Sequence, residues 1–286
     1  MKAPATPIAR APLKEALTAL FADPRDKAFF FELDGVLFAD RRTGAADPPA
    51  DVPIDLLAEL ERLAGGAVAV LSKAPLDDVD RILAPLRLAG CGLSGLEIRR
   101  DRDGPATRRR FAADLDPVRR LLERRPSLEA QVGVIDEDLA LAFRHDGDPA
   151  GLEAAKSFAR DAVALAPAAF RADFGSVAIR VTFAGASVGG AICQIMETAA
   201  FAGRTPVVFG PAGEGNDHLA VAHVYGGTTV TVGRAVAGHT ADIVLEGPRD
   251  VQWVVRDFIA HFGAECRASF EDDVPLHGDA AGSRWR

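Results

Sequence analysis

Short apolar runs alternate with helical patterns along most of this chain, and that alternation limits the fold more than any other feature. Residues 28–35, AFFFELDG, are typical of a strand buried on both faces, because an aromatic run is bounded by charge and glycine. Residues 53–65, PIDLLAELERLAG, place apolar side chains at helical spacing and end in glycine. The pattern continues with strands at 67–72, 205–210, 228–233 and 241–247 and helices at 75–86, 187–203, 216–224 and 248–262. The sequence therefore predicts an α/β core, a doubly wound parallel sheet with helices on both faces.

The middle of the chain follows a different order, in which a helix is followed by two strands, twice over. These elements are expected at 117–126, 129–136, 139–146, 151–166, 170–176 and 177–183. A helix-strand-strand repeat is an α+β layer and does not continue the βαβ order of the core. We therefore expect residues 100–183 to form a cap domain, inserted into a core domain made of residues 1–99 and 184–286.

Charge and cysteine content exclude several classes of function. A net charge of −8 argues against binding to nucleic acid. No apolar run approaches the roughly 18 residues that a membrane-spanning helix needs. The three cysteines are scattered without metal-ligand spacing, and prolines interrupt the start of the chain before a signal-type apolar stretch can form. We expect a cytoplasmic protein that contacts neither nucleic acid nor membrane.

Chemistry in open α/β sheets lies beyond the carboxyl ends of the strands. After the first strand, Glu32 and Asp34 occupy alternate positions and Gly35 follows them. Such a carboxylate pair can serve as nucleophile and general acid, and the glycine lets the backbone turn close to a phosphate. Alternatively, Asp34 and Gly35 are only a turn at the end of the strand.

Three further strand ends carry candidate residues. Ser72 can hold a phosphate oxygen or act as a plain helix cap. The helix at 187–203 offers free N–H groups to an anion, but no Lys or Arg occurs between Arg180 and Arg204, so a glycine-rich turn that allows close helix packing is favoured. Glu214 and Asp217 can be oxygen ligands for Mg²⁺, or the latter can cap its helix.

Two histidines stand near these segments. His218 and His223 are five residues apart, which does not place both on one face of a helix, so we interpret His218 as a surface residue near a helix start. His145 can meet a ligand of the cap, although a role in a turn is the simpler interpretation.

Seven segments carry a resemblance to a known family. They are FFFELDGVL, AVAVLSKAPLDDVDRIL, GCGLSGLEIR, LALAFRHDGDP, AGASVGGAICQIMETAAFAGRTPVVFG, GGTTVTVG and ADIVLEGPRDVQWVVRDFI. In order and spacing they resemble the trehalose-6-phosphate phosphatase family of the haloacid-dehalogenase (HAD) superfamily, from about residue 12 to residue 263. The resemblance implies a HAD-like core with a C2-type cap, hydrolysis of trehalose 6-phosphate to trehalose and phosphate, and Mg²⁺ as cofactor.

The resemblance also assigns roles to single residues. In the family, the first Asp of Asp-x-Asp-Gly attacks phosphorus and binds Mg²⁺, and the second is the acid/base and lends its carbonyl to the metal. The corresponding residues are Glu32 and Asp34 for catalysis and metal binding, Gly35 and Ser72 for phosphate, and Asp217 as a displaced metal ligand, if a metal binds. Glu32 carries its carboxylate about 1.5 Å further from the backbone, and a displacement of about 1 Å can lower the rate on the order of 100-fold.

Other catalytic positions depart from the family pattern. Val188 stands where the third motif has a lysine, Pro211-Ala212 replaces the Asp pair of the fourth motif, and Lys73-Ala74 replaces the Gly-Arg of the second. The loss of one such electrostatic contact typically costs about 2.7–4 kcal/mol, so two losses would lower the rate by roughly 10⁴–10⁶ if they were additive.

The cap departs as well. The family grips its disaccharide with Glu, Lys and Glu, and the resemblance places Ile135, Glu137 and Ala178 there. Glu137, His145 and Arg180 remain the candidate contacts of the cap with a substrate.

Three interpretations follow. The first is a pseudophosphatase that keeps the fold without competent hydrolysis and binds a sugar phosphate or a protein partner. The second is an active phosphatase for trehalose 6-phosphate or another small molecule, with Glu32 as the nucleophile. The third is a regulatory subunit that associates with enzymes of the trehalose pathway.

Overall fold

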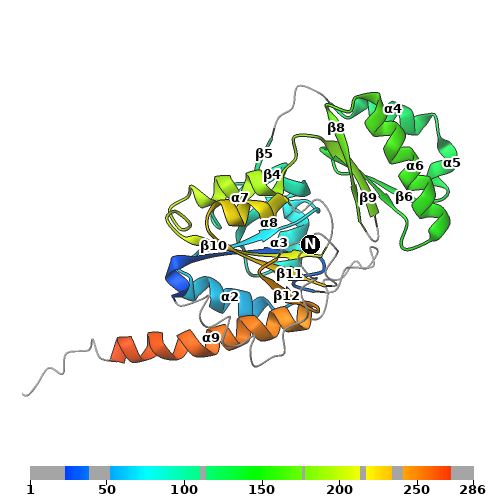
Figure 1. Ribbon diagram of the computed structural model, residues 1–286. Coiled ribbons are helices and arrows are strands. Elements are labelled where there is room, and N and C mark those ends of the chain that lie inside the picture. Colours follow the sequence, from blue (N-terminus) through cyan, green and yellow to red (C-terminus); the bar gives the residue numbers. More distant parts are fainter. Residues whose placement is uncertain are drawn as a thin grey trace, which may run out of the picture.

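The structure is a computed structural model that describes residues 23–38, 52–109, 114–175, 178–212, 217–233 and 241–271, with side chains of the last segment described to residue 262. Within these residues the chain forms two β-sheets with helices packed on them (Figure 1). The larger sheet and its helices form the core. The smaller sheet and its helices form a separate cap, drawn in green.

The larger sheet has the strand order β12-β11-β10-β1-β2-β3-β4-β5. Its strands are β1 (Lys27–Glu32), β2 (Val68–Leu71), β3 (Ala89–Gly92), β4 (Glu97–Arg99), β5 (Thr107–Arg108), β10 (Thr205–Pro211), β11 (Thr228–Val232) and β12 (Ile243–Leu245). The strands from β12 to β3 run parallel, whereas β4 and β5 continue the sheet in antiparallel fashion. The predicted fold class, a parallel α/β sheet with an α+β cap, is confirmed.

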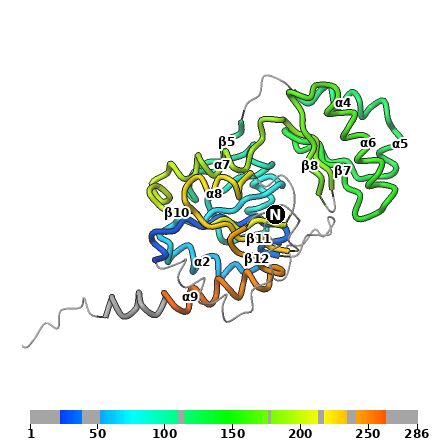
Figure 2. Tube along the Cα trace, in the orientation of Figure 1, coloured from blue at the N-terminus to red at the C-terminus, as the bar shows by residue number. Residues whose placement is uncertain are grey.

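Helices cover both faces of this sheet. They are α2 (Ile54–Leu63), α3 (Leu76–Leu83), α7 (Val188–Met196), α8 (Asp217–Val224) and α9 (Pro248–Glu271), with the short 3₁₀ turns η1 (Pro24–Asp26) and η2 (Leu93–Gly95). Helices α7 and α8 pack together on one face, and α2 and α9 pack together on the other (Figures 1 and 2).

Strand β1 lies in the middle of the sheet, where its phenylalanines bury both faces. Phe29 meets Phe258 of α9 with ring centroids 5.4 Å apart, and Phe31 stacks on Phe209 of β10 at 4.5 Å. Phe30 points to the opposite face, because successive side chains of a strand alternate, and its ring lies 5.6 Å from that of Phe201.

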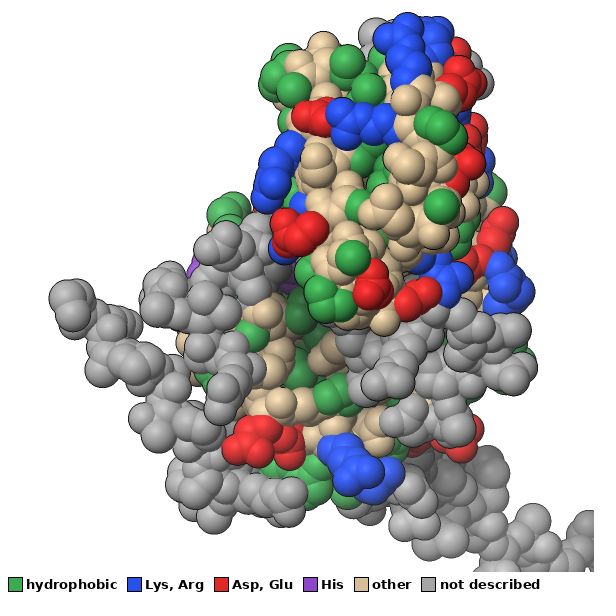
Figure 3. All heavy atoms as spheres, turned by 90° about the vertical axis from the view of Figure 1, so that its right-hand side faces the viewer, with side chains coloured by type: hydrophobic (Ala, Val, Ile, Leu, Met, Phe, Trp, Pro, Cys, Tyr) green, Lys and Arg blue, Asp and Glu red, His purple; other side chains and the backbone are tan. Residues whose placement is uncertain are grey.

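The cap sheet has the order β6-β7-β9-β8. Its strands are β6 (Gly133–Asp136), β7 (Ala140–Arg144), β8 (Phe170–Phe174) and β9 (Ala178–Phe183), accompanied by the helices α4 (Asp116–Glu123), α5 (Pro126–Glu129) and α6 (Pro149–Leu165). Its own apolar core, which includes Phe143 and Phe158, lies between the sheet and the helices. On the visible surface of the cap, basic and acidic side chains are interspersed (Figure 3). The domain boundaries at residues 100 and 183 stay a prediction.

Several elements differ from the prediction. Strands β3, β4 and β5 were not expected, and α5 occupies the start of the strand predicted at 129–136. The helix predicted at 187–203 ends at Met196, where the Thr198 hydroxyl bonds to the Ile195 carbonyl at 2.8 Å. Gly203, at φ 77°, lies in the turns that lead from there to β10. In the part of the chain that the structure describes, none of the helices combines the length and apolar character needed to span a bilayer.

The central strand supplies a test of the fold. Phe30 is fully buried and packs on Phe201, so Phe30→Ala should lower the free energy of unfolding by about 3–5 kcal/mol through lost burial and a cavity. The measurement is urea unfolding followed by circular dichroism. Leu165→Ala, at a side chain that is 49% exposed, is the control and should change stability by less than about 0.5 kcal/mol. Equal effects of the two substitutions would contradict the described core.

Candidate phosphate site between core and cap

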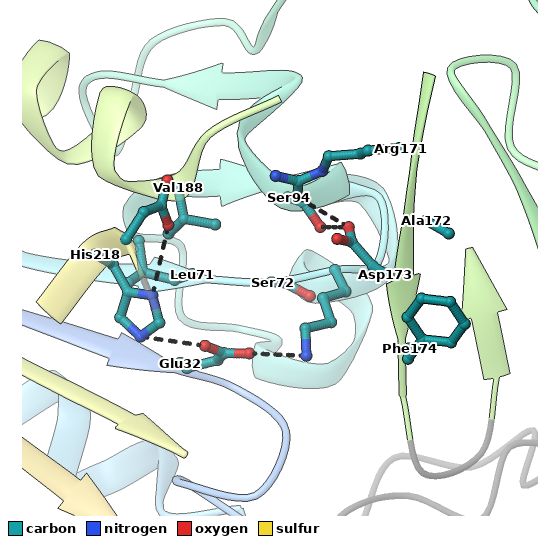
Figure 4. Close-up of a pocket in the computed structure, with 12 residues that line it drawn as sticks. Glu32, Leu71, Ser72, Ser94, Arg171, Ala172, Asp173, Phe174, Val188 and His218 are labelled. Carbon is teal, nitrogen blue, oxygen red and sulfur yellow. Dashed lines mark hydrogen bonds and ion pairs between the residues drawn. The ribbon is translucent and has the colours of Figure 1, made fainter. Parts of the chain in front are cut away.

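A cavity of about 620 Å³ lies between the carboxyl end of the large sheet and the cap. This volume is within the range of small-molecule sites. Its core side includes Glu32, Ser72, Lys73, Val188 and His218 (Figure 4). Its cap side comes from β8, with the side chains of Arg171, Asp173 and Phe174. The cavity therefore collects charged groups from segments that lie far apart in the sequence.

Glu32 is the last residue of β1, and its carboxylate is buried between two nitrogen groups. By alternation it points to the same side of the sheet as Phe30, which is the side that α7 and α8 cover. The Lys73 ammonium is 3.6 Å from Glu32 Oε1, and the His218 Nε2 atom is 3.6 Å from Glu32 Oε2 (Figure 4). Each carboxylate oxygen thus faces a different basic side chain of the protein.

Lys73 brings a positive charge that the sequence analysis did not place in this site. The residue follows Ser72 at the end of β2, which pairs with β1, and the register sets Glu32 beside Leu71. Because the ends of parallel neighbours meet at one edge of the sheet, the lysine reaches the Glu32 carboxylate. The absence of a lysine at Val188 is therefore partly offset by a lysine from another loop.

His218 is buried, and its interpretation as a surface residue is wrong. The residue is 3% exposed, and its Nε2 atom has no hydrogen-bond partner among the described residues. The ring lies directly on β10 at Gly210, where an added Cβ would be 2.3 Å from Nε2. A glycine at the end of this strand is the sequence signal that could have indicated the packed imidazole.

Asp217, the predicted displaced metal ligand, is bonded to the start of α7 in the described structure. Its Oδ2 atom accepts hydrogen bonds from Ser187 Oγ at 2.7 Å and from the Gly189 N–H at 3.2 Å. Burial favours the neutral carboxyl, but the neighbouring His218 ring and these two donors outweigh it and lower the pKa of Asp217 to about 2. The residue holds the start of α7 against the start of α8.

The start of α7 packs as the sequence predicted. A Cβ on Gly189 would be 2.7 Å from the Val221 side chain, so this glycine permits close contact of α7 with α8. Ser187 is the N-cap and accepts the Gly190 N–H at 2.8 Å. Val188 lines the cavity as an apolar residue.

Of the other predicted site residues of the core, one lines the cavity and two lie in the turn after β1. Ser72 lines the cavity and accepts the Ala74 N–H at 3.0 Å, so it shapes the loop and is not the helix N-cap, which is Pro75. Asp34 and Gly35 lie in the turn after β1, where the Gly35 N–H bonds to the Phe38 carbonyl at 2.9 Å, and neither lines the cavity. Glu214 lies outside the described residues.

The predicted cap contacts lie away from the cavity lining. Glu137 and Arg180 form a partly buried ion pair, with the Arg180 Nε and Glu137 Oε2 atoms 3.1 Å apart, and neither residue lines the cavity. Burial, only partly opposed by Arg180, raises the pKa of Glu137. His145 accepts the Gly147 N–H at 3.2 Å in the turn after β7, which agrees with its interpretation as a turn residue.

The cap residues that do line the cavity were missed in the sequence. Asp173 Oδ2 accepts hydrogen bonds from Ser94 Oγ at 3.1 Å and from the Arg171 guanidinium at 3.0 Å. Arg171 also donates to the Ala186 carbonyl at 2.8 Å. The pair joins cap to core, and alternation along β8 and β9 places it on the same sheet face as Glu137 and Arg180. Because the four residues alternate onto one face of the cap sheet, strand periodicity in the sequence could have indicated Arg171 and Asp173 as candidates.

The described residues around Glu32 do not fit a Mg²⁺ ion. Mg²⁺ takes oxygen ligands in near-octahedral geometry, whereas the two basic side chains that face the Glu32 carboxylate present nitrogen atoms. The Asp217 Oδ2 atom is engaged at the start of α7, and the described part of the chain holds no group of three or more His, Cys, Asp or Glu side chains suited to a metal. Magnesium stays an expectation that comes from the resemblance.

Comparisons with known proteins point to one group. No protein-family model matches the chain. It is 26% identical over 230 residues to a probable trehalose-phosphate phosphatase of Sinorhizobium fredii, covering 80% of this chain and 86% of that protein. It is 28% identical over 220 residues to the trehalose-6-phosphate phosphatase of Escherichia coli, covering 72% of this chain and 77% of that protein.

Solved structures agree on the fold. The C-terminal domain of the trehalose-6-phosphate phosphatase of C. albicans superimposes with a TM-score of 0.74 at 15% identity, covering 89% of this chain and 98% of that one. A HAD-superfamily phosphatase of Bacteroides thetaiotaomicron gives a TM-score of 0.54 at 17% identity, covering 83% and 95%. The resemblance seen in the sequence, and the HAD fold that it implied, are confirmed.

The Asp217 cap supplies a pH-dependent test. A folded-state pKa of about 2 stabilises the protein above the unfolded pKa near 4, and this contribution is lost as the pH falls through about 2. The side chain is 42% exposed, so after allowance for solvent screening Asp217→Asn should lower the free energy of unfolding by about 1 kcal/mol at pH 7.

The difference between Asp217→Asn and the unchanged protein should shrink in urea unfolding as the pH is lowered from 7 toward 3. His218, which also faces this carboxyl, is present in both proteins, so the comparison reports the change at residue 217. Asp103→Asn, at a side chain that is 85% exposed, is the control and should have no effect. A difference that grows in acid would contradict the assigned role.

Proposed function

Because this chain is a trehalose-6-phosphate phosphatase-like protein with the HAD fold, we propose that it is a pseudophosphatase that binds a sugar phosphate without competent hydrolysis. The observation that carries the proposal is the position of Glu32, whose two carboxylate oxygens face Lys73 and His218. A nucleophilic carboxylate of this family needs a metal ion beside it and a free line of attack on phosphorus. Here basic side chains of the protein occupy that neighbourhood.

The predicted general acid of the reaction is also missing from the residues that line the cavity. Hydrolysis through Glu32 would form an acyl phosphate while the leaving sugar oxygen takes a proton, and that proton would come from Asp34. Asp34 does not line the cavity, and Pro211 continues β10 at the position expected for a carboxylate. The cavity lining therefore supports binding of a sugar phosphate better than its hydrolysis.

The cap side of the cavity supports a polar ligand larger than phosphate. Arg171 and Asp173 present charged groups toward the core residue Ser94, and Phe174, which is 58% exposed, adds an apolar ring to the cap side (Figure 4). Sugar rings combine hydroxyl groups with apolar faces, and this mixture of lining groups suits them. We place the phosphate near the core residues and the sugar near β8.

An active phosphatase is the second candidate, and Lys73 is the observation that favours it. A lysine 3.6 Å from Glu32 can neutralise both a nucleophilic carboxylate and an incoming phosphoryl group, which is the role that Val188 cannot fill. In that case Glu32 attacks phosphorus, and Glu32→Gln abolishes turnover.

A third candidate is association with enzymes of the trehalose pathway in place of a small ligand. It would leave the cavity without a function of its own. Copurification from a cell extract together with a lack of sugar-phosphate binding is the result that favours it.

One pair of measurements separates the three candidates. Phosphate release from trehalose 6-phosphate is followed with Mg²⁺ present, and binding of the same compound is followed by titration calorimetry. We expect binding and no release above the uncatalysed rate. Release at a rate typical of enzymes, about 1–10³ s⁻¹, would refute the pseudophosphatase and favour the active enzyme. If the protein neither binds trehalose 6-phosphate nor releases phosphate from it, the association with pathway enzymes is favoured.

The division of the cavity into two subsites is testable with one cap substitution. Asp173→Asn removes a charge that faces the proposed sugar subsite and leaves Lys73 and His218 in place. It should weaken calorimetric binding of trehalose 6-phosphate on the order of tenfold, as expected for one lost charged hydrogen bond, and leave binding of inorganic phosphate unchanged. Asp161→Asn, at another arginine-paired carboxylate, on α6 outside the cavity, is the control. Equal loss for both ligands would contradict the assignment of Asp173 to the sugar.

A further inference from the structure

We propose that Lys73 and His218 form a metal-independent phosphate-binding pair, and that the Glu32 carboxylate occupies this pair and competes with the ligand. The inference rests on the proposed function, since it names the groups that hold the phosphate of the bound compound. It also reverses the role of Glu32. In an enzyme this residue would recruit a metal ion and thereby the phosphate, whereas here its negative charge opposes phosphate.

The contacts of Glu32 leave room for displacement. The N···O distances from Lys73 and from His218 to Glu32 are both 3.6 Å, which is longer than the 2.7–3.2 Å of an N–H···O hydrogen bond. Lys73 is 41% exposed and has a flexible stem, so its ammonium can move from the carboxylate to a phosphate oxygen. Lys73 and His218 therefore lie close to the Glu32 carboxylate but do not form hydrogen bonds of normal length with it.

His218 supplies the observation that points directly to a ligand. Its Nε2 atom is buried, lies at the cavity, and has no hydrogen-bond partner among the described residues. A buried polar atom without a partner costs about 1–3 kcal/mol, which a ligand oxygen could recover. Gly210 leaves the space that the ring occupies, so the imidazole packs directly on β10 next to its carboxyl end.

On the core side of the cavity, the start of α7 is already bonded within the protein or apolar. The N–H groups of Gly189 and Gly190 at the start of α7 are bonded to Asp217 and Ser187. Val188 presents an apolar side chain to the cavity. Ser72 accepts the Ala74 N–H, so its own hydroxyl can donate to an oxygen beside Lys73. A phosphate in this part of the cavity is therefore directed to Lys73 and His218.

The sign of one substitution separates this site from a magnesium site. Glu32→Gln keeps the size of the side chain and removes its charge. If Glu32 held Mg²⁺, phosphate binding would weaken and would require the metal. If Glu32 competes for Lys73 and His218, binding becomes tighter, on the order of tenfold for the removal of one nearby like charge, and does not depend on a metal.

The experiment is titration calorimetry with inorganic phosphate and with trehalose 6-phosphate, in EDTA and again with Mg²⁺. Glu32→Gln should bind both compounds more tightly than the unchanged protein, equally in EDTA and in Mg²⁺. Lys73→Met and His218→Asn should each weaken binding at least about fivefold. Glu61→Gln, at a buried glutamate paired with Arg102 outside the cavity, and Lys156→Met on α6 are the matched controls and should bind as the unchanged protein does.

Circular dichroism and thermal unfolding establish that each variant is folded. If Glu32→Gln does not fold, the Lys73→Met and His218→Asn arms decide the outcome, since unchanged phosphate binding in both would overturn the proposal. Weaker or unchanged binding by folded Glu32→Gln, binding that requires Mg²⁺, or no phosphate binding by any variant would also overturn it. The proposed function fails separately, when the unchanged protein releases phosphate from trehalose 6-phosphate or does not bind that compound.

Discussion

The burial of β1 on both faces determines where the chemistry of this protein can lie. Phe29 and Phe31 fill one side of the sheet and Phe30 fills the other, so the strand has one possible register. That register turns Glu32 toward α7 and α8 and sets it beside the end of β2. The contacts of its carboxylate with Lys73 and His218 are a consequence of how the central strand packs.

The elements that could be predicted from the sequence are those whose apolar residues recur with a clear helical or strand periodicity. The aromatic and aliphatic strands, most helix positions and the α+β order of the cap could be predicted, because each has a periodicity of its own. Strand β3 could not, since Ala89–Gly92 lacks β-branched or aromatic residues; a Cβ on Gly90 would lie 2.2 Å from the Val70 carbonyl, so close backbone approach dictates that residue. His218 was misplaced because its burial depends on a space that Gly210 leaves in another element.

Basic side chains reach the cavity from positions other than those at which the resemblance expects them. Comparison at the third motif identified a missing lysine, and the structure shows a lysine from the second motif beside the same carboxylate. The end of β10 lacks the expected acidic pair, and the ring of His218 lies over that strand end. Two basic side chains of the protein thus lie around Glu32, where the resemblance implied a metal ion and a different lysine.

Val188 and Asp217 both determine what the start of α7 can bind. A lysine at the start of α7 would bring a positive charge to a phosphate, whereas the valine leaves the helix N-terminus without one. Asp217 then supplies a carboxylate from within the chain to the Gly189 N–H and the Ser187 hydroxyl, and a negative charge at a helix N-terminus is stabilising. An internal anion thereby satisfies the helix end that could otherwise receive an external one. With the N–H groups of Gly189 and Gly190 already bonded, the phosphate that we propose on the core side of the cavity is left to Lys73 and His218, against the charge of Glu32.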